Sequence, residues 1–457
     1  MKKLKYIASL LVYAVSFMAF AQESHTSYFM EGMVKRHELN PALSSNCNYV
    51  SIPVIPVFSG LAIGANSNLG TDKFLFKRNG EIVTGLNSAV SADEFLGGLK
   101  DNNTLELNLK YDIISFGFKK WGGFNTFGLS LKSSTGIELP YELFEFAKRG
   151  QVDGGVTSYD LSDMKVHTTN YVELALGHSR DINEKWRVGA KVKYLGGLAR
   201  ADINLETMKV TMSADKWSIR ETGKAFYTDA LDVRYKSNGE IDDVDFGEIG
   251  VAGSGIGFDL GATFKPIDNL TVSASLTDLG FMSWKGTEAS VNPDEFIFDG
   301  FQHLAAEKDP DGDSALKREG DQLEEDLRKL ARFEQTEDGG KTESLATTLR
   351  VGAEYAILNN KISFGLLSSN RFGSSIKWSE VMASANFRPA RWFNATINGS
   401  VSNLGSSIGA IINFCPKGFN FYFGTDYVPL SYSKQGVPLD AIKFNFVIGM
   451  AITFKHD

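Results

Sequence analysis

Cysteine is scarce in this 457-residue chain, which contains only Cys47 and Cys415. Two cysteines are too few for a disulfide scaffold, so one bridge and two separate packed thiols both remain open. The six histidines form no H-x-x-x-H pair and no His/Cys cluster, and therefore do not support a zinc site. Proline is also low, at 11 residues, whereas glycine reaches 45 and phenylalanine 33. This balance is typical of a β-rich chain.

After residue 21 the sequence has no apolar run long enough for a membrane-spanning helix. The first 21 residues differ, because Lys2, Lys3 and Lys5 precede an apolar stretch that ends in Ala19-Phe20-Ala21. We predict a cleaved signal peptide over residues 1–21. Removing its three lysines would change the net charge from −8 to −11, which argues against nucleic acid as a partner. A mature chain that crosses a membrane would have to do so as a closed sheet.

The strongest pattern is alternation with period two. In the last segment, every second residue from Phe444 to Phe454 is apolar, while the residues between them are small or polar. Similar runs occur at Leu105–Tyr111 and Leu349–Tyr355. The expected strands that contain these runs are long enough for the roughly 9–11 residues that a tilted strand needs to cross a bilayer. A soluble β-sandwich also alternates, but its strands are usually shorter, at about 5–6 residues.

The alternating runs predict an all-β fold, a transmembrane antiparallel β-barrel of about 14 strands. We expect the strands at 49–66, 104–118, 124–136, 167–180, 185–199, 254–265, 270–280, 345–357, 361–369, 376–387, 392–403, 405–414, 419–428 and 442–455. The even-numbered strands are followed by short links, and strands one, three, five, seven and thirteen by long ones. Short turns on one side and long loops on the other are typical of outer-membrane barrels.

Tryptophans beside the expected strand ends suggest two interfacial girdles. Trp121, Trp186 and Trp392 adjoin short turns, and Trp284 and Trp378 adjoin the opposite strand ends. The alternative is that these residues are ordinary core.

Two insertions interrupt the expected barrel. Residues 200–253 are predicted to form a β-rich extracellular loop. Residues 281–344 are charged and predicted to be partly helical, because leucines between Leu304 and Phe333 recur with helical spacing. This stretch could cap the barrel mouth, fold as a small helical hairpin beside it, or be a solvated loop.

Three short motifs resemble enzyme or metal sites but lack the necessary context. The G-x-S-x-G pattern at 405–409 begins a strand, whereas a hydrolase needs a strand–turn–helix elbow. The acidic loop 309–313 lacks the glycine and glutamate of an EF-hand, which leaves a turn or a loose calcium site. Residues 339–342 end like a phosphate-binding loop but lack its first glycine. We predict no enzymatic activity, no catalytic residues and no cofactor.

If the apolar face meets lipid, the opposite face lines the barrel interior and carries charges of both signs. The lumen candidates are Glu106, Lys110, Asp112, Lys191, Lys193, Asp259, Arg350, Glu354, Asp426 and Lys443. They could pair across the barrel or with a plug, or form a salt-bridged filling with no transport role.

Two stretches resemble known outer-membrane proteins. The segment Met33 to Leu43 places Asn40-Pro41-Ala42 just before the first strand, which resembles the N-terminal segment of long-chain fatty-acid transporter (FadL-like) barrels and their PorV-type relatives. Ser275 to Trp284 resembles a strand end in an uncharacterised group of outer-membrane proteins from Bacteroidota. The resemblance implies a 14-stranded barrel, a plug folded into its lumen, and passage of hydrophobic solutes.

The expected organisation is therefore a plug segment at 22–48 followed by a barrel at 49–457. The plug and gate candidates are Tyr28, Phe29, Met30, Asn40, Pro41, Ala42 and Leu43. We expect a protein of the outer membrane, in contact with its lipid, that binds or conducts small molecules, including hydrophobic ones. The charged lumen departs from the resemblance, since a fatty-acid route requires an apolar pocket. The alternative is a non-transporting scaffold with a secretion-system, adhesion or other surface protein as its partner.

Overall fold

The computed structural model describes residues 24–52, 60–78, 81–152, 155–235, 241–246, 250–291, 296–298, 333–373, 377–428 and 444–456. The predicted signal peptide, Lys443, the acidic loop 309–313 and the predicted helical stretch 304–332 lie outside these ranges.

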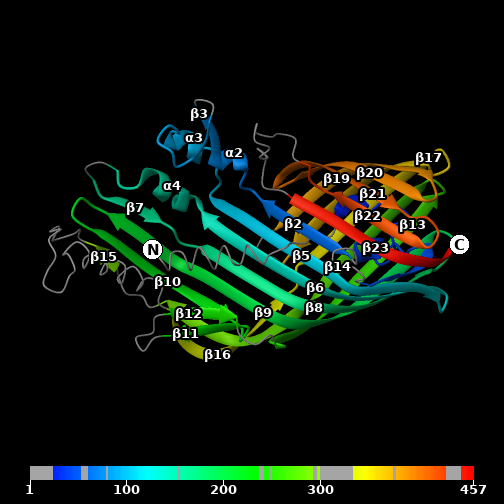
Figure 1. Cartoon of the computed structure of the whole chain (residues 1–457), viewed down its shortest axis with the longest axis horizontal. Helices are drawn as coiled ribbons and strands as arrows, with labels where there is room; N and C mark the ends of the chain where they lie inside the picture. Colours follow the sequence, from blue (N-terminus) through cyan, green and yellow to red (C-terminus); the bar gives the residue numbers. More distant parts are fainter. Residues whose placement is uncertain are drawn as a thin grey trace.

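Fourteen strand positions close into an antiparallel barrel within the described ranges (Figure 1). The first position holds both β1 (Cys47–Ser51) and β2 (Leu61–Ser67), each of which pairs with the second strand and with the last. The other thirteen, in order around the barrel, are β5 (Asn102–Lys120), β6 (Gly123–Pro140), β8 (Met164–Asp181), β9 (Trp186–Met212), β13 (Gly253–Ile267), β14 (Leu270–Val291), β17 (Thr347–Ile357), β18 (Ile362–Phe372), β19 (Trp378–Ala390), β20 (Phe393–Ser402), β21 (Gly405–Phe414), β22 (Phe419–Thr425) and β23 (Phe444–His456). The predicted fold class is confirmed.

Alternation along the strands separates an apolar exterior from a polar interior. In β17, the side chain of Val351 is 47% exposed, whereas that of Arg350 is 5% exposed. In β23, Ile452 and Phe454 point outward while Asn445 and Thr453 are buried. An exterior of this kind suits acyl chains, because every backbone polar group is already paired around the cylinder.

The barrel has a short-turn end, with links such as 120–123 and 357–362, and an opposite long-loop end. At the short-turn end, Trp121 and Gly122 adopt positive φ of 55° and 71° and reverse the chain within two residues. Trp121, Trp186 and Trp392 are exposed there, as a girdle requires.

The predicted second girdle is wrong, because Trp284 and Trp378 are buried inside the barrel. In β14 the odd-numbered residues up to Thr277 face inward, but after Asp278, which has φ of 59°, Met282 and Trp284 do so. The register shift between Phe258 and Leu260 on β13 marks the bulge. One extra residue exchanges the two faces of a strand.

Several strands continue beyond the barrel at its long-loop end. The parts of β9 and β14 beyond the barrel pair with β10 (Trp217–Tyr227), which also pairs with β15 (Phe296–Phe298); β7 (Thr157–Asp160) joins β9, and β16 (Phe333–Ser344) joins β14. A separate hairpin consists of β11 (Leu231–Tyr235) and β12 (Ile241–Phe246). The ends of the insertion at 281–344, predicted to be charged and partly helical, are thus strands, because they extend an existing hairpin.

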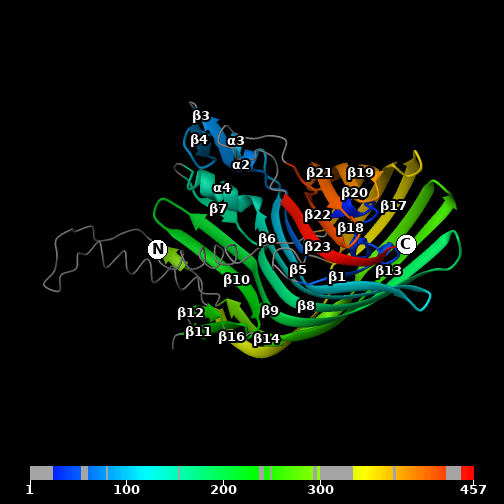
Figure 2. The same cartoon turned by 45° about the vertical axis from the view of Figure 1, so that its right-hand side comes forward.

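Three helices and a small hairpin gather at one side of the long-loop end (Figures 1 and 2). They are α2 (Thr71–Phe74), α3 (Ala92–Leu96), α4 (Tyr141–Arg149), β3 (Leu75–Arg78) and β4 (Glu81–Thr84), and Phe95, Leu96 and Val90 form their core. In the part of the chain that is described, no helix is long and apolar enough to cross a membrane.

Candidate functional site

Residues 24–46, here called the luminal segment, lie inside the barrel (Figure 2). The segment includes two short 3-10 turns, η1 (His25–Ser27) and η2 (Arg36–Glu38). Near the long-loop end, the Ser24 hydroxyl donates to the Asp426 carboxylate at 2.6 Å, and the backbone N–H groups of His25 and Thr26 donate to it at 3.0 and 2.9 Å. At the other end, the segment leads into β1 beside the short turns.

Asn40-Pro41-Ala42 packs on a pair of wall glycines. The Asn40 side chain accepts the Ala42 N–H at 2.9 Å and donates to the Tyr28 hydroxyl and the Ala274 carbonyl. Beneath it lie Gly189 of β9 and Gly261 of β13, which are cross-strand partners. A Cβ on Gly189 would lie 2.7 Å from the Ala42 nitrogen, and one on Gly261 2.9 Å from Pro41 Cδ. The absence of side chains at both positions lets the segment approach the wall backbone.

The predicted gate residues Tyr28, Phe29, Met30 and Leu43 all make apolar contacts with other residues inside the barrel. Tyr28, Phe29 and Leu39 form one cluster with Leu367 and Met382 of the wall, and Leu43 packs against it. Met30 belongs to a second cluster with Met33, Ile411, Tyr422 and Val447. The Phe29 ring lies against Gly352 and Gly365, where a Cβ on Gly365 would approach Phe29 Cε2 to 2.6 Å.

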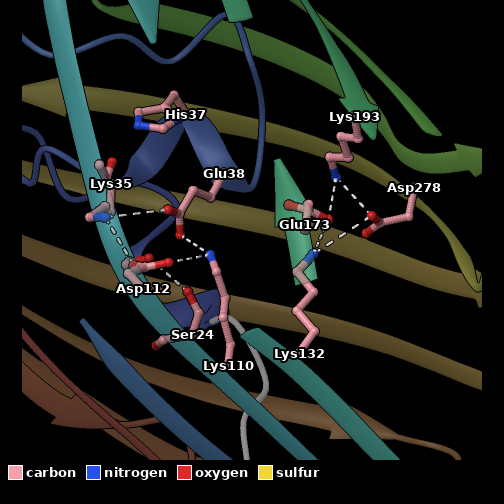
Figure 3. A network of polar contacts seen from close by, with 12 residues as sticks. Ser24, Lys35, His37, Glu38, Lys110, Asp112, Lys132, Glu173, Lys193 and Asp278 are labelled. Carbon is pink, nitrogen blue, oxygen red and sulfur yellow. Dashed lines mark hydrogen bonds and ion pairs between the residues drawn. The ribbon is translucent and has the colours of Figure 1, made fainter. Parts of the chain in front are cut away.

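A four-residue ion network joins the luminal segment to β5 (Figure 3). Lys35 Nζ lies 2.9 Å from Asp112 and 3.7 Å from Glu38, and Lys110 Nζ lies 2.5 Å from Glu38 and 3.8 Å from Asp112. Two cations alternate with two carboxylates, so each charge has opposite charges beside it. Buried charges need such compensation, since removing one partner leaves another uncompensated.

A second network lies entirely within the wall (Figure 3). Lys193 Nζ lies 2.8 Å from Asp259 and 2.7 Å from Asp278, and Lys132 Nζ lies 2.7 Å from Glu173 and 3.8 Å from Asp278. Asp259 also accepts the backbone N–H of Asp278 at 2.8 Å and so fixes the bulge in β14. These charged side chains come from the barrel strands and pair with one another there, not with residues 24–46.

The nine lumen candidates within the described residues are all buried. Lys110, Asp112 and Asp426 contact the luminal segment directly, and Arg350 donates to the Leu39 carbonyl at 3.5 Å. Glu354 contacts the luminal segment indirectly, through Arg388. The Arg388 guanidinium lies 2.5 Å from Glu354 and donates to the Phe29 carbonyl at 2.7 Å. The other four lie elsewhere in the wall: Glu106, Lys191, Lys193 and Asp259.

Several site residues were not found from the sequence. They are Lys35, Glu38, Lys132, Glu173, Asp278, Arg371 and Arg388. Lys35 and Glu38 stand in a segment whose apolar residues follow no regular repeat. Arg388 was assigned to a short link, although it lies within the last residues of β19. Glu173 could have been found, because it stands between Val172 and Leu174 in a predicted strand.

Both histidines of the luminal segment are held in their neutral form. Burial, and then the Arg350 and Arg371 guanidiniums, lower the pKa of His25 well below its usual value. Burial, and then Lys191, lower the pKa of His37, whose Nε2 lies 2.6 Å from the Tyr49 hydroxyl. For Glu38, burial raises the pKa, but Lys110 and Lys35 outweigh it and keep the carboxylate charged.

Acidification from pH 7.5 to 5.5 is expected to loosen the luminal segment. A released histidine takes up a proton below about pH 6.5, whereas a seated one does not, so the segment's stability is complete above that pH and falls below it. The equilibrium constant for release should rise up to about tenfold per histidine for each pH unit. Bilayer conductance at the two pH values measures this, and a response unchanged in a His25→Asn/His37→Gln double variant would contradict it.

Polar cavities lie beside the luminal segment in the described part of the chain. One of about 130 Å³ lies between His25 and the strands β5, β6, β8, β14, β17, β18 and β19. A smaller cavity, of about 40 Å³, lies beside the four-residue ion network and Tyr422.

Cys47 and Cys415 are both free thiols. No group of three or more His, Cys, Asp or Glu side chains that could hold a metal occurs in the described ranges.

The fold and the interior together define a β-barrel whose lumen holds the chain's own N-terminal residues. Residues 41–426 match a family of unknown function (DUF5723), and the chain belongs to this family. No curated protein matches this chain.

Among solved structures, the chain is similar to the Ralstonia pickettii toluene transporter TbuX (9% identity, 96% of this chain and 95% of that chain, TM-score 0.41). It is also similar to the P. putida toluene transporter TodX (8%, 96% and 97%, TM-score 0.42) and to a Pseudomonas aeruginosa FadL homologue (11%, 96% and 100%, TM-score 0.40).

Proposed function

We propose that this protein is an outer-membrane barrel that binds and conducts small molecules, with residues 24–46 as its gate. The observation that carries the proposal is the seating of the luminal segment. Its Asn-Pro-Ala element packs on bare wall glycines, while one buried ion network ties it to the wall. Both cysteines are free thiols, so in the described residues no disulfide ties the segment to the wall, and seating through non-covalent contacts suits a segment that must move.

The exported, signal-cleaved form and the outer-membrane location belong to this proposal. They are supported by the apolar exterior and by the basic and apolar start of the sequence. The relation to PorV-type proteins and to Bacteroidota remains a prediction. The solutes that pass are proposed to be small, and hydrophobic ones would need an amphipathic character, because the interior is lined with charges of both signs.

Deleting residues 23–45 is expected to open the barrel. An empty lumen of fourteen strands is wide enough for water and small solutes, so liposome swelling with a small sugar should accelerate roughly tenfold or more. Swelling that stays at the rate of the intact chain, with an unchanged β-sheet circular dichroism spectrum, would show that the segment is not the barrier.

A further inference from the structure

The inner surface of the barrel divides into a charged part and an uncharged part. None of the residues of β20, β21 and β22 is charged, and β23 has no charged residue before Lys455. The strands from β5 to β19, in contrast, carry the ion networks and most of the other lumen charges. Four neighbouring strands therefore present a neutral face to the lumen, where an uncharged solute would displace no ion pair.

Asparagine amides lie side by side on this neutral face. Asn394 of β20 and Asn413 of β21 are direct cross-strand partners, and Asn420 of β22 donates to the Asn413 side chain at 3.0 Å. Asn398 lies further along β20. We call these four residues the amide patch. Each amide offers donors and an acceptor, so the patch suits groups that accept hydrogen bonds and groups that donate them.

The luminal segment covers the amide patch with small polar groups. Asn420 donates to the Gly32 carbonyl at 3.0 Å, and Asn398 donates to the Thr26 hydroxyl. Gly32 has φ of 87°, and a Cβ there would lie 2.9 Å from the Asn394 amide nitrogen. Without a side chain at this position, the backbone of the segment reaches the amides. A hydroxyl and a carbonyl of the chain itself thus occupy places that oxygen atoms of a solute would take after release.

The seated segment leaves part of the amide patch unused. In the described part of the chain, Asn413 Nδ2, Asn398 Oδ1 and Asn420 Oδ1 have no hydrogen-bond partner, although all three residues are more than nine-tenths buried. A buried amide atom without a partner costs free energy that a matching ligand atom would recover. The unused atoms include a donor and acceptors, and a hydroxyl group matches both with a single oxygen atom.

An aromatic ring adjoins the amides. Tyr422 of β22 is the cross-strand partner of Asn413, and its buried side chain packs with Ile411 and Val447 of the neighbouring strands. The face of the ring is apolar, whereas the amides beside it are polar. A sugar has the same division, with apolar C–H groups on the faces of its ring and hydroxyls around the edge.

We propose that the amide patch and Tyr422 bind an uncharged polyhydroxylated solute, of the size of a small sugar, once residues 24–46 are released. This inference rests on the release of the segment in the proposed function, and it names the class of molecule that the barrel takes up. A charged solute would find no opposite charge on these strands, and a hydrocarbon would leave the amides without partners, which is unfavourable. The solute and the luminal segment compete for the same wall, so the solute favours the released state.

Trypsin cleavage after Arg36 in the full-length mature protein measures this competition, because Arg36 is buried in the seated segment. A solute that binds only the released state raises its population by mass action, so a dissociation constant of about 0.1 M would accelerate cleavage about sixfold at about 0.5 M glucose. We expect that increase or a larger one. Exclusion of sugar from the protein surface acts in the opposite direction and slows cleavage. Cleavage that is unchanged, slowed or absent in glucose would overturn the proposal.

Two solution controls separate binding from bulk effects. Glycine betaine at the same osmolality has no hydroxyl groups and should not accelerate cleavage. A free arginine-containing peptide in the same solution corrects for any change in trypsin itself. Equal acceleration by glycine betaine would mean that the amide patch does not recognise hydroxyls, and would overturn the proposal.

Two leucine variants locate the binding. Asn413→Leu and Asn398→Leu each remove one amide at similar volume, and should reduce the glucose response, the ratio of cleavage rates with and without the sugar, to below about twofold. The ratio removes the effect of each variant on seating itself. Asn108→Leu is the matched control, because Asn108 is also buried with an unpartnered Nδ2 but lies on β5 among the charged residues. A response that persists in both patch variants, or that the control loses equally, would overturn the proposal.

The cleavage assay requires no passage through the barrel. If deleting residues 23–45 leaves swelling unchanged while glucose accelerates cleavage, the gate role fails and the binding of the sugar stands. If the deletion accelerates swelling while glucose does not accelerate cleavage, only the proposed class of solute fails.

Discussion

Gly189→Ala is expected to unseat the luminal segment and open the barrel. The added methyl group would meet backbone atoms of Pro41 and Ala42, and lies 2.7 Å from the Ala42 nitrogen. Backbone atoms cannot turn aside as a flexible side chain can, so Asn40-Pro41-Ala42 must move away from the wall. Overpacking of this kind typically costs about 1–3 kcal/mol, enough to raise the released population roughly 5- to 150-fold. Single-channel conductance reads this directly.

Gly196→Ala provides a matched control for that prediction. Gly196 lies on the same strand, β9, and a Cβ there meets nothing within 4 Å. Both substitutions change backbone entropy alike, so only the clash distinguishes them. Conductance raised equally by both variants would mean that the wall glycines do not seat the segment.

Asp112→Asn is expected to release the luminal segment from β5. Asp112 lies 2.9 Å from Lys35 and 3.8 Å from Lys110, and in the variant these two buried ammonium groups share the Glu38 carboxylate. Breaking a buried ion pair from one side costs about 3–5 kcal/mol. Trypsin should then cleave after Arg36, a site that is buried in the seated segment.

A double variant separates the loss of attraction from the cost of an orphaned charge. Lys35→Met/Asp112→Leu removes both partners and leaves Glu38 beside Lys110 at 2.5 Å. Apolar replacement of a whole buried pair is often neutral, so protection of Arg36 should largely return. If the double variant is cleaved as fast as Asp112→Asn, the network does not hold the segment in the way described.

The wall of the barrel could be predicted from the sequence because the two faces of each strand meet different surroundings, lipid and lumen, which imposes an alternation of apolar and polar residues. Every second residue faces lipid, and that repeat alone located all fourteen strand positions. Most predicted ends lie within a few residues of the observed ones, whereas β9 and β14 run on to Met212 and Val291. Outside the membrane the alternation continues, but no acyl chains demand apolar residues, so the pattern weakens.

The interior was only partly predictable. Lys110 and Asp112 could be assigned to the lumen by their parity, but Lys35 and Glu38 could not, because the luminal segment has no repeat. Trp284 was misplaced since a single residue, Asp278, exchanges the faces of β14. Contacts between elements far apart in sequence, such as Pro41 on Gly189, leave no local signal beyond the glycine itself.

The rate at which a maleimide labels a cysteine placed at position 27 tests most directly whether residues 24–46 fill the lumen. Ser27 is buried, whereas Ser158 on β7 is exposed. With Cys47 and Cys415 changed to serine, a bulky maleimide should label Ser27→Cys at least roughly tenfold more slowly than Ser158→Cys, since labelling must wait for release of the segment. Equal labelling rates at the two positions would contradict the account.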